Sequence, residues 1–296
     1  MSQEKVIVVT GATGRQGGAA LRHLSAQGWS VRGLSRNPTS TAARRLERDG
    51  IEIVRGNLEE PASLRAAFQG AYGVYSVQSF WDSGVEREIV QGKNVADAAK
   101  ASGVQHFVYS SVGSAARGSG VEHFESKFVI EDYARSLGLP ATFVRPSCFM
   151  ENYYIPEVEI GILKGSLMDP VRAEKPFQLI AIDDIGAFVA HVFSRPAELV
   201  GQAIDIAGDE LTNPQAAAVF SKVMDRPVRF KRLPPLVVRA FMGEMRPMFT
   251  WFNDVGFKAD VRATRARFPE VRWKNLEDWL YSEGWDKRAK AVRKAV

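Results

Sequence analysis

The stretch that decides the fold is Val6-Ile7-Val8-Val9-Thr10-Gly11-Ala12-Thr13-Gly14-Arg15-Gln16-Gly17. Its first five residues are β-branched, which is typical of a strand buried in a parallel sheet. The glycines that follow permit a tight turn, and they let backbone N–H groups approach a pyrophosphate at the positive end of the next helix. The stretch therefore predicts a strand, a phosphate-binding loop and a helix; a tight turn without a ligand is the alternative.

Strand-like and helical patterns alternate through the first 150 residues. Apolar runs predict strands at 6–10, 30–35, 51–54, 73–77, 107–110 and 141–145. Helical runs lie between them, the longest at 86–102 and 122–137. Strands joined by helices form right-handed crossovers and a parallel sheet that is covered on both faces. We expect an α/β fold with a doubly wound Rossmann-type parallel sheet and a second, smaller, mainly helical lobe.

The pattern divides the chain into two lobes. Residues 1–150 are expected to form the dinucleotide-binding Rossmann domain, and strand and helix segments near 177–208 return to it. Residues 151–176 and 209–296 form the smaller lobe, which holds a substrate or a partner. Within that lobe, the segment 241–252 is rich in methionine and aromatic residues. It predicts either an ordinary core helix or an adaptable pocket wall or partner surface.

Composition argues against several classes of protein. The 296 residues include 39 basic and 34 acidic ones, but no zinc-finger or RNA-binding motif, so we expect no direct nucleic-acid contact. Cys148 is the single cysteine, which excludes an intramolecular disulfide and argues against a metal site. No apolar run approaches the roughly 20 residues of a membrane span, and no signal-peptide pattern is present. We expect a cytoplasmic protein without membrane contact, either a monomer or a homodimer.

The choice of dinucleotide depends on the end of the second strand. An NAD site places an acidic residue about 20 residues after the glycine loop to bind the ribose 2′-hydroxyl. This chain has no acidic residue between Glu4 and Glu47, and Arg36 follows the second strand. A guanidinium binds a 2′-phosphate that a carboxylate would repel, and Arg15 is a second candidate. The pattern favours NADP(H) over NAD(H); a solvated turn cation is the alternative for Arg36.

Further cofactor contacts are expected where the other strands end, because ligands of this fold lie at the carboxyl ends of the strands. Asn57 and Leu58 follow the third strand and are expected to flank the adenine. Gln78, Ser79 and Phe80 follow the fourth strand and are expected to line the nicotinamide half. The alternative for each is an ordinary loop residue.

Three separated motifs resemble the NmrA-like family of atypical short-chain dehydrogenases: residues 11–17, residues 147–153 (Ser-Cys-Phe-Met-Glu-Asn-Tyr) and residues 178–186 (Gln-Leu-Ile-Ala-Ile-Asp-Asp-Ile-Gly). The resemblance implies a Rossmann fold that binds NADP(H). It also implies which residues bind the cofactor: Gly11, Thr13, Gly14, Arg15, Gln16, Gly17, Arg36, Lys127, Pro146, Phe149 and Asn152. It covers most of residues 4–210 and weakens in the last 80 residues.

One departure from the dehydrogenase pattern bears on catalysis. Ordinary short-chain dehydrogenases place a tyrosine one helical turn before a lysine, and the lysine lowers the pKa of the phenol. Here Lys127 is present, but His123 stands at the tyrosine position. Lys127 is expected to bind the nicotinamide ribose or to act as an acid, and His123 is either a substitute acid or a partly exposed helix-start residue. Ser110 stands where dehydrogenases bind the substrate carbonyl.

Two functions follow, and the sequence leaves both open. The missing tyrosine beside a strong phosphate loop favours a regulatory protein whose conformation follows the cofactor. The resemblance implies that such a regulator senses NADPH and NADP and binds a regulatory protein partner. Lys127 and Ser110 instead suit an NADPH-dependent reductase of a quinone or similar small apolar carbonyl substrate. A sugar-nucleotide epimerase shares the fold but fits poorly, because its chemistry relies on the tyrosine.

Overall fold

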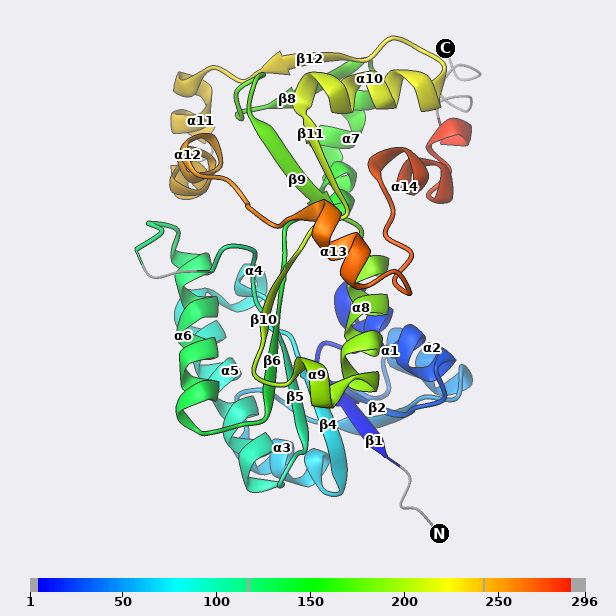
Figure 1. Ribbon diagram of the computed structural model, residues 1–296, viewed down its shortest axis with the longest axis vertical. Coiled ribbons are helices and arrows are strands. Elements are labelled where there is room, and N and C mark those ends of the chain that lie inside the picture. Colours follow the sequence, from blue (N-terminus) through cyan, green and yellow to red (C-terminus); the bar gives the residue numbers. More distant parts are fainter. Residues whose placement is uncertain (1–4, 116–117, 242, 289–296) are drawn as a thin grey trace. The chain divides into compact units, whose positions relative to one another are not determined.

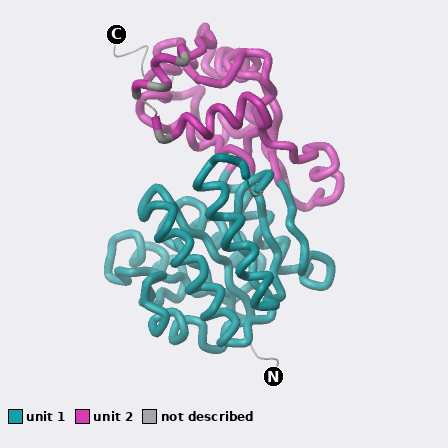
Figure 2. The backbone as a smooth tube through the Cα atoms, turned by 90° about the vertical axis from the view of Figure 1, so that its left-hand side faces the viewer, with its two compact units in different colours: residues 1–146, 182–205 teal, residues 147–181, 206–296 magenta. Residues whose placement is uncertain are grey.

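A computed structural model describes residues 5–115, 118–241 and 243–288. The chain forms two compact units, coloured separately in Figure 2. Unit 1 consists of residues 1–146 and 182–205, and unit 2 of residues 147–181 and 206–296. None of the described helices is long and apolar enough to cross a membrane.

Unit 1 is built on a seven-stranded sheet in the order β10-β6-β5-β4-β1-β2-β3. Its strands are β1 (Val6–Val9), β2 (Ser30–Ser35), β3 (Glu52–Arg55), β4 (Ala71–Ser76), β5 (His106–Ser110), β6 (Ala141–Pro146) and β10 (Ala203–Ile206). The pairings from β3 through β6 are all parallel, as the crossover pattern predicts. The doubly wound Rossmann-type sheet is therefore confirmed, and the carboxyl ends of its parallel strands meet at one edge.

Helices cover both faces of this sheet (Figure 1). They are α1 (Arg15–Ala26), α2 (Thr41–Arg48), α3 (Pro61–Phe68), α4 (Phe80–Ser83), α5 (Val85–Ala101), α6 (Glu122–Ser136), α8 (Ile182–Ser194) and α9 (Pro196–Leu199). On one face α5 packs against α3 and α6; on the other, α1 packs against α8. A Cβ on Gly186 would lie 2.6 Å from the carbonyl carbon of Ala19, so that contact requires glycine.

Unit 2 contains two small sheets and several helices. The strands β11 (Asp209–Thr212), β9 (Pro176–Ile180) and β7 (Cys148–Phe149) form one sheet, and β8 (Ser166–Asp169) pairs with β12 (Arg229–Arg232). The helices are η1 (Met150–Tyr154), α7 (Pro156–Leu163), α10 (Asn213–Met224), α11 (Pro235–Phe241), η2 (Gly243–Met245), α12 (Arg246–Asp254), α13 (Val261–Arg267) and α14 (Leu276–Ser282). Phe220, Trp279 and Trp285 are fully buried in the core of this unit.

Two expectations for the second half need correction. The strand near residue 177 does not return to the large sheet: β9 pairs with β11 and β7, and the chain re-enters unit 1 only at α8. Strand periodicity identifies a strand but not its partner, which explains the error. The segment 241–252 is not one helix, because α11, η2 and α12 divide it. Trp251 and Phe252 of α12 are buried, as a core role predicts; Met242 lies outside the described residues.

Candidate functional site

The glycine loop joins β1 to α1 and is tied to the end of β4. The Thr10 hydroxyl donates to the carbonyl of Val77 at 3.0 Å, and the Val77 amide donates to the same hydroxyl at 2.8 Å. The amide of Gly14 donates to the carbonyl of Gly11 at 2.9 Å, which closes the turn. The loop is therefore fixed at the edge where β1 and β4 end.

The structure constrains each glycine of this loop in a different way. Gly11 has φ +60°, which favours glycine, and a Cβ on Gly17 would lie 2.3 Å from the carbonyl oxygen of Gly11. A Cβ on Gly14 would lie 3.2 Å from that oxygen, a tight contact that a small shift relieves. Gly14 caps α1 without a side chain, and the first turn of α1 has no acidic residue. The arrangement is that of an anion site at a helix N-terminus, with Thr13 and Arg15 exposed.

Gln16 and Ser110 meet below the loop. The Gln16 side-chain amide donates to the hydroxyl of Ser110, which ends β5. Ser110 is 2% exposed, so this predicted catalytic hydroxyl is buried and already bonded. The neighbouring Ser111 is buried too, and its hydroxyl has no hydrogen-bond partner within the described part of the chain. Burial raises the pKa of Tyr75 well above its usual range.

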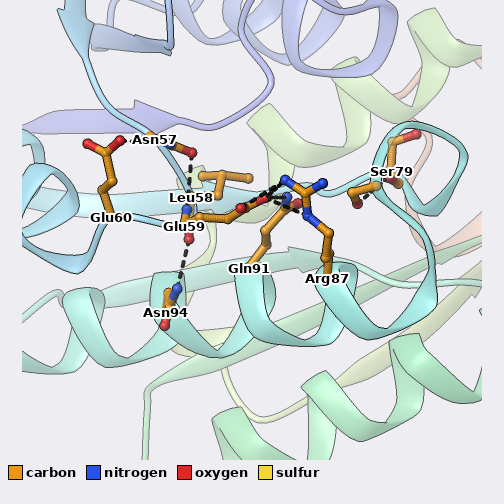
Figure 3. Close-up of polar contacts among 9 residues, drawn as sticks. Asn57, Leu58, Glu59, Glu60, Ser79, Arg87, Gln91 and Asn94 are labelled. Carbon is orange, nitrogen blue, oxygen red and sulfur yellow. Dashed lines mark hydrogen bonds and ion pairs between the residues drawn. The ribbon is translucent and has the colours of Figure 1, made fainter.

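Arg36 is exposed directly after β2, at the position expected for a residue that binds a 2′-phosphate. A carboxylate that the sequence did not indicate lies near this end of the sheet. Hydrogen bonds from Gln91 and Arg87, with a smaller contribution from the charge of Arg36, lower the pKa of Glu59. The Arg87 guanidinium holds Glu59 at 2.6 Å (Figure 3).

The Glu59 loop is shaped by the two residues predicted to flank the adenine. The Asn57 side chain donates to Glu60 at 2.9 Å and accepts from the amide of Glu59 at 3.2 Å (Figure 3). The carbonyl of Leu58 accepts from Asn94 of α5 at 2.9 Å. Asn57 therefore folds the loop with its side chain, and Leu58 anchors it through its backbone.

The segment after β4 presents backbone oxygens rather than the expected side-chain amide. The Gln78 side chain is 6% exposed and donates to Ser76 at 2.9 Å. The backbone carbonyl of Gln78 accepts a hydrogen bond from the Lys127 ammonium of α6 at 2.9 Å. The Ser79 carbonyl accepts from Ser83 inside α4. This end of the predicted cofactor path is therefore organised around the Lys127 ammonium.

Lys127 has a second, charged partner. Its Nζ lies 2.7 Å from Oε1 of Glu88 on α5, a residue that is 0% exposed. The hydroxyl of Ser126 donates to the other carboxylate oxygen of Glu88. The Lys127 side chain keeps 13% of its surface exposed. The Lys127 side chain is therefore partly accessible, whereas its counter-ion is fully buried.

His123 is half-buried near the start of α6, which fits a partly exposed helix-start residue, but its ring is packed rather than free in solvent. Its ring stacks on Phe80, with 4.3 Å between centroids and 10° between planes, and Phe80 also contacts Trp81 at 4.1 Å. Burial, with a smaller effect of the Lys127 charge, lowers the pKa of His123 to about 4. The imidazole is therefore neutral at pH 7, and a neutral imidazole is a poor proton donor.

Unit 2 holds the remaining predicted cofactor residues, while Pro146 ends β6 in unit 1. Phe149 lies in β7, and the side-chain amide of Asn152 lies 3.2 Å from the Cys148 sulfur. In the same unit, burial raises the pKa of Asp169 to about 6. The cofactor roles of Phe149 and Asn152 stay predictions.

The model of the NmrA-like family matches residues 3–280. The chain belongs to the NmrA-like family. One relative is the NmrA-like family domain-containing oxidoreductase FrzB of Cladobotryum sp. It is 37% identical to this chain, and the match covers 78% of this chain and 76% of FrzB. Among solved structures, this NmrA-like chain resembles NmrA, a negative transcriptional regulator, in complex with NADP. That likeness has a TM-score of 0.77, 24% identity and 98% coverage of both chains.

The quinone oxidoreductase QOR2 of Escherichia coli, solved with NADPH, has the same fold. Its TM-score is 0.81 at 22% identity, over 94% of this chain and 99% of that chain. The nitrogen metabolite repression protein nmrA of Emericella nidulans is 28% identical over 80% of this chain and 70% of its own length. Relatives of this chain are thus named as a repression protein and as an oxidoreductase, which agrees with either function expected from the sequence. No group of three histidine, cysteine, aspartate or glutamate side chains among the described residues is placed to hold a metal.

Two residues of this NmrA-like site escaped the sequence reasoning. Glu88 lies on the buried stripe of α5 with Gly92, Val95 and Ala99, and a glutamate on an apolar stripe signals a buried partner. Trp81 is 66% exposed and lies in α4, the short helix that follows β4. The available signal was the aromatic pair Phe80-Trp81 in the connection that follows this strand.

Proposed function

We propose that this protein binds NADP(H) at the carboxyl edge of the unit 1 sheet and acts as a regulator that responds to the cofactor's redox state. One observation carries the cofactor assignment. The loop that contains Gly11, Gly14 and Gly17 ends at an acid-free helix N-terminus, and the exposed Arg36 follows the neighbouring strand. A 2′-phosphate suits this pair of features, because a guanidinium binds it through charged hydrogen bonds.

The side chains expected to act in catalysis already contact other residues of the protein, which supports a role as a regulator. Ser110 is buried and bonded to Gln16, and His123 is neutral and stacked on Phe80. Lys127 is paired with a buried carboxylate. No residue at the tyrosine position supplies a phenol, so the usual proton donor of a dehydrogenase is missing. A protein that binds the cofactor without turning it over fits this arrangement.

The test compares the oxidised and reduced cofactors. Hydrogen exchange is measured on the protein saturated with NADPH and, separately, with NADP⁺, after calorimetric titration has established saturation. A regulator is expected to differ in protection of at least one segment of unit 1 between the two states. It should also oxidise no NADPH over a quinone and aldehyde panel. Identical exchange patterns, or robust turnover, would contradict the regulator.

A reductase is the second candidate, and the exposed aromatic surface favours it. Trp81 is 66% exposed, and its neighbour Phe80 is held by His123, one helical turn before Lys127. A fixed aromatic face near a cation suits a planar conjugated carbonyl such as a quinone. Among the described residues of unit 1, the other exposed large apolar side chains are Val90 and Val200, too few to form the apolar centre of a protein interface of about 800 Å² per partner.

The reductase is tested with 1,4-naphthoquinone and the saturated bicyclic ketone 1-decalone as acceptors. A stacking site should reduce the planar quinone and not the saturated ketone. Trp81→Leu should raise the KM for the quinone about tenfold, and Trp81→Phe should raise it less than threefold. Tyr281→Leu, at an exposed aromatic of unit 2, is the matched control. An unchanged KM in Trp81→Leu would remove the aromatic surface from the reaction.

We propose a cytoplasmic location for either function, because both depend on a pool of free NADP(H). A regulator needs a protein partner, whereas a reductase needs a small apolar substrate; neither role involves direct nucleic-acid contact. The oligomer is proposed to be a monomer or a homodimer. Light scattering after gel filtration distinguishes these two states.

A further inference from the structure

Glu88 is a fully buried carboxylate in unit 1, and its surroundings place it in the core between two helices. It lies on α5, and α6 packs against that helix. Each carboxylate oxygen faces a group of α6: Oε1 faces the Lys127 Nζ at 2.7 Å, and Oε2 accepts from the Ser126 hydroxyl. Two consecutive residues of α6 therefore meet one buried anion.

Burying a carboxylate is unfavourable unless a cation and hydrogen bonds compensate for the lost water. A hydrophobic pair of similar volume often stabilises a fold as well as a buried ion pair does. Stability alone therefore does not explain why Lys127 and Glu88 form a buried ion pair here. Lys127 supplies a further reason, because its side chain stays 13% exposed while Glu88 is 0% exposed.

The ammonium is held from two directions. Glu88 attracts it from α5, and the backbone carbonyl of Gln78 accepts from it just after β4, within the segment predicted to line the nicotinamide. In the dehydrogenase pattern a tyrosine would stand one turn earlier. Here His123 occupies that position and stacks on Phe80 instead. The buried carboxylate thus supplies the fixed charge that directs the lysine.

We propose that Glu88 is a positioning residue for cofactor binding: it holds the Lys127 ammonium where the nicotinamide ribose is bound. The inference rests on the proposed NADP(H) site. It concerns the nicotinamide end alone, because Glu88 and Lys127 lie on α5 and α6, whereas Arg36 follows β2 and the glycine loop follows β1. The consequence is specific: loss of the Glu88 charge weakens ligands that contain the nicotinamide ribose and spares ligands that lack it.

Two ligands separate this role from a general structural one. NADPH occupies both ends of the site, whereas adenosine 2′,5′-bisphosphate carries the 2′-phosphate but no nicotinamide ribose. Calorimetric titration of Glu88→Gln, which keeps the shape and removes the charge, is expected to show an NADPH Kd about tenfold higher. The Kd for adenosine 2′,5′-bisphosphate should stay within twofold of the wild-type value.

Glu131→Gln is the matched control. Glu131 is a fully buried carboxylate on α6, and it pairs with Arg145 at 2.7 Å rather than with Lys127. This variant should leave both dissociation constants within twofold. If Glu88→Gln does not fold, Glu88→Asp takes its place, because it keeps the charge but withdraws it by one methylene. The Asp variant should raise the NADPH Kd severalfold and leave the bisphosphate unchanged.

The possible results are distinct. Selective loss of NADPH affinity in the Glu88 variant supports the positioning role. Equal loss for both ligands, or no loss for either, overturns it. Wild-type protein that binds neither ligand overturns the proposed NADP(H) site itself, and the role of Glu88 falls with it.

Discussion

The two ends of the proposed cofactor path in unit 1 are built on opposite principles. At the adenosine end, Arg36 is exposed after β2, and the glycine loop presents backbone N–H groups at the start of α1. At the nicotinamide end, Lys127 is anchored by Glu88 and by the Gln78 carbonyl. The adenosine end exposes its positive charge to the solvent, whereas the nicotinamide end holds its ammonium in one fixed position.

The difference shows where cofactor affinity and cofactor positioning arise. An exposed guanidinium selects a phosphate by charge and tolerates small displacements. An ammonium held by a buried partner stays in one place, so it positions a ribose rather than attracting an anion from a distance. Each of the predictions below changes one of these two ends.

The largest effect is expected from two glycine variants of the adenosine end. Gly17→Ala places a Cβ 2.3 Å from the carbonyl oxygen of Gly11, an overlap that costs about 3 kcal/mol or more and distorts the loop. Gly14→Val meets the same oxygen at 3.2 Å, so its fold should survive while the side chain fills the phosphate position. Urea unfolding and NADPH titration measure the two effects.

Both variants should lower NADPH affinity more than 100-fold, but only Gly17→Ala should lower stability substantially. Gly28→Ala provides the control. Unlike Gly14 and Gly17, Gly28 has a positive φ of +83°, so alanine is strained there, but a Cβ at this position meets nothing within 4 Å. Its NADPH affinity should equal that of the wild type. Normal NADPH binding by folded Gly14→Val would mean that the loop is structural alone.

The next effect concerns the nicotinamide end. Lys127→Ala removes the cation that compensates Glu88, which is 0% exposed, and should lower the free energy of unfolding by about 3–5 kcal/mol. The double variant Lys127→Met/Glu88→Gln removes both charges and should recover most of that loss. Urea unfolding of both proteins against the wild type measures it.

An activity assay on Lys127→Ala alone therefore mixes loss of function with loss of fold, and the double variant is the better probe. If Lys127→Ala proved as stable as the wild type, the ion pair between Lys127 and Glu88 would not exist in solution.

The smallest effect is a pH dependence at His123. The folded state lowers its pKa to about 4, against an ordinary value of 6.5, so the fold favours the neutral ring. The corresponding stability is complete above pH 6.5 and is lost as the pH falls from 6.5 towards 4. His123→Phe removes this loss and keeps the stacking on Phe80. Between pH 7 and pH 5, its unfolding free energy should gain about 2 kcal/mol on the wild type.

The comparison of the two proteins isolates His123 from other buried groups. His106, whose pKa burial also lowers to about 4, and Asp169, whose pKa burial raises to about 6, titrate in both proteins and cancel. Parallel stability curves for the wild type and His123→Phe would show that the fold does not lower the pKa of the imidazole.

Most of the unit 1 fold was predictable, because it depends on local patterns. The β-branched run at Val6–Val9, the glycine loop and the long amphipathic helices specify a parallel sheet with its helices in place. The partner of β9 was not predictable. Its pattern fits any half-buried strand, and its pairing with β11 depends on contacts that are distant in sequence.

The same division applies to the candidate site. Arg36 and the loop glycines form a local pattern, so the sequence indicated them. The pair of Glu88 and Lys127 joins residues on different helices, and a single sequence does not show which buried glutamate meets which lysine. The burial of Ser110 under Gln16 has the same origin, because it depends on how β5 packs beside the loop.

The central claim is that this NmrA-like protein is built for NADP(H), and one measurement tests it most directly. Calorimetric titration of NADPH and NADH is carried out on the wild type and on Arg36→Glu. The wild type should bind NADPH at least about tenfold tighter than NADH, because a charged hydrogen bond contributes about 1.5–3 kcal/mol. Arg36→Glu should abolish or reverse that preference. Equal affinity of the wild type for the two cofactors would contradict the account.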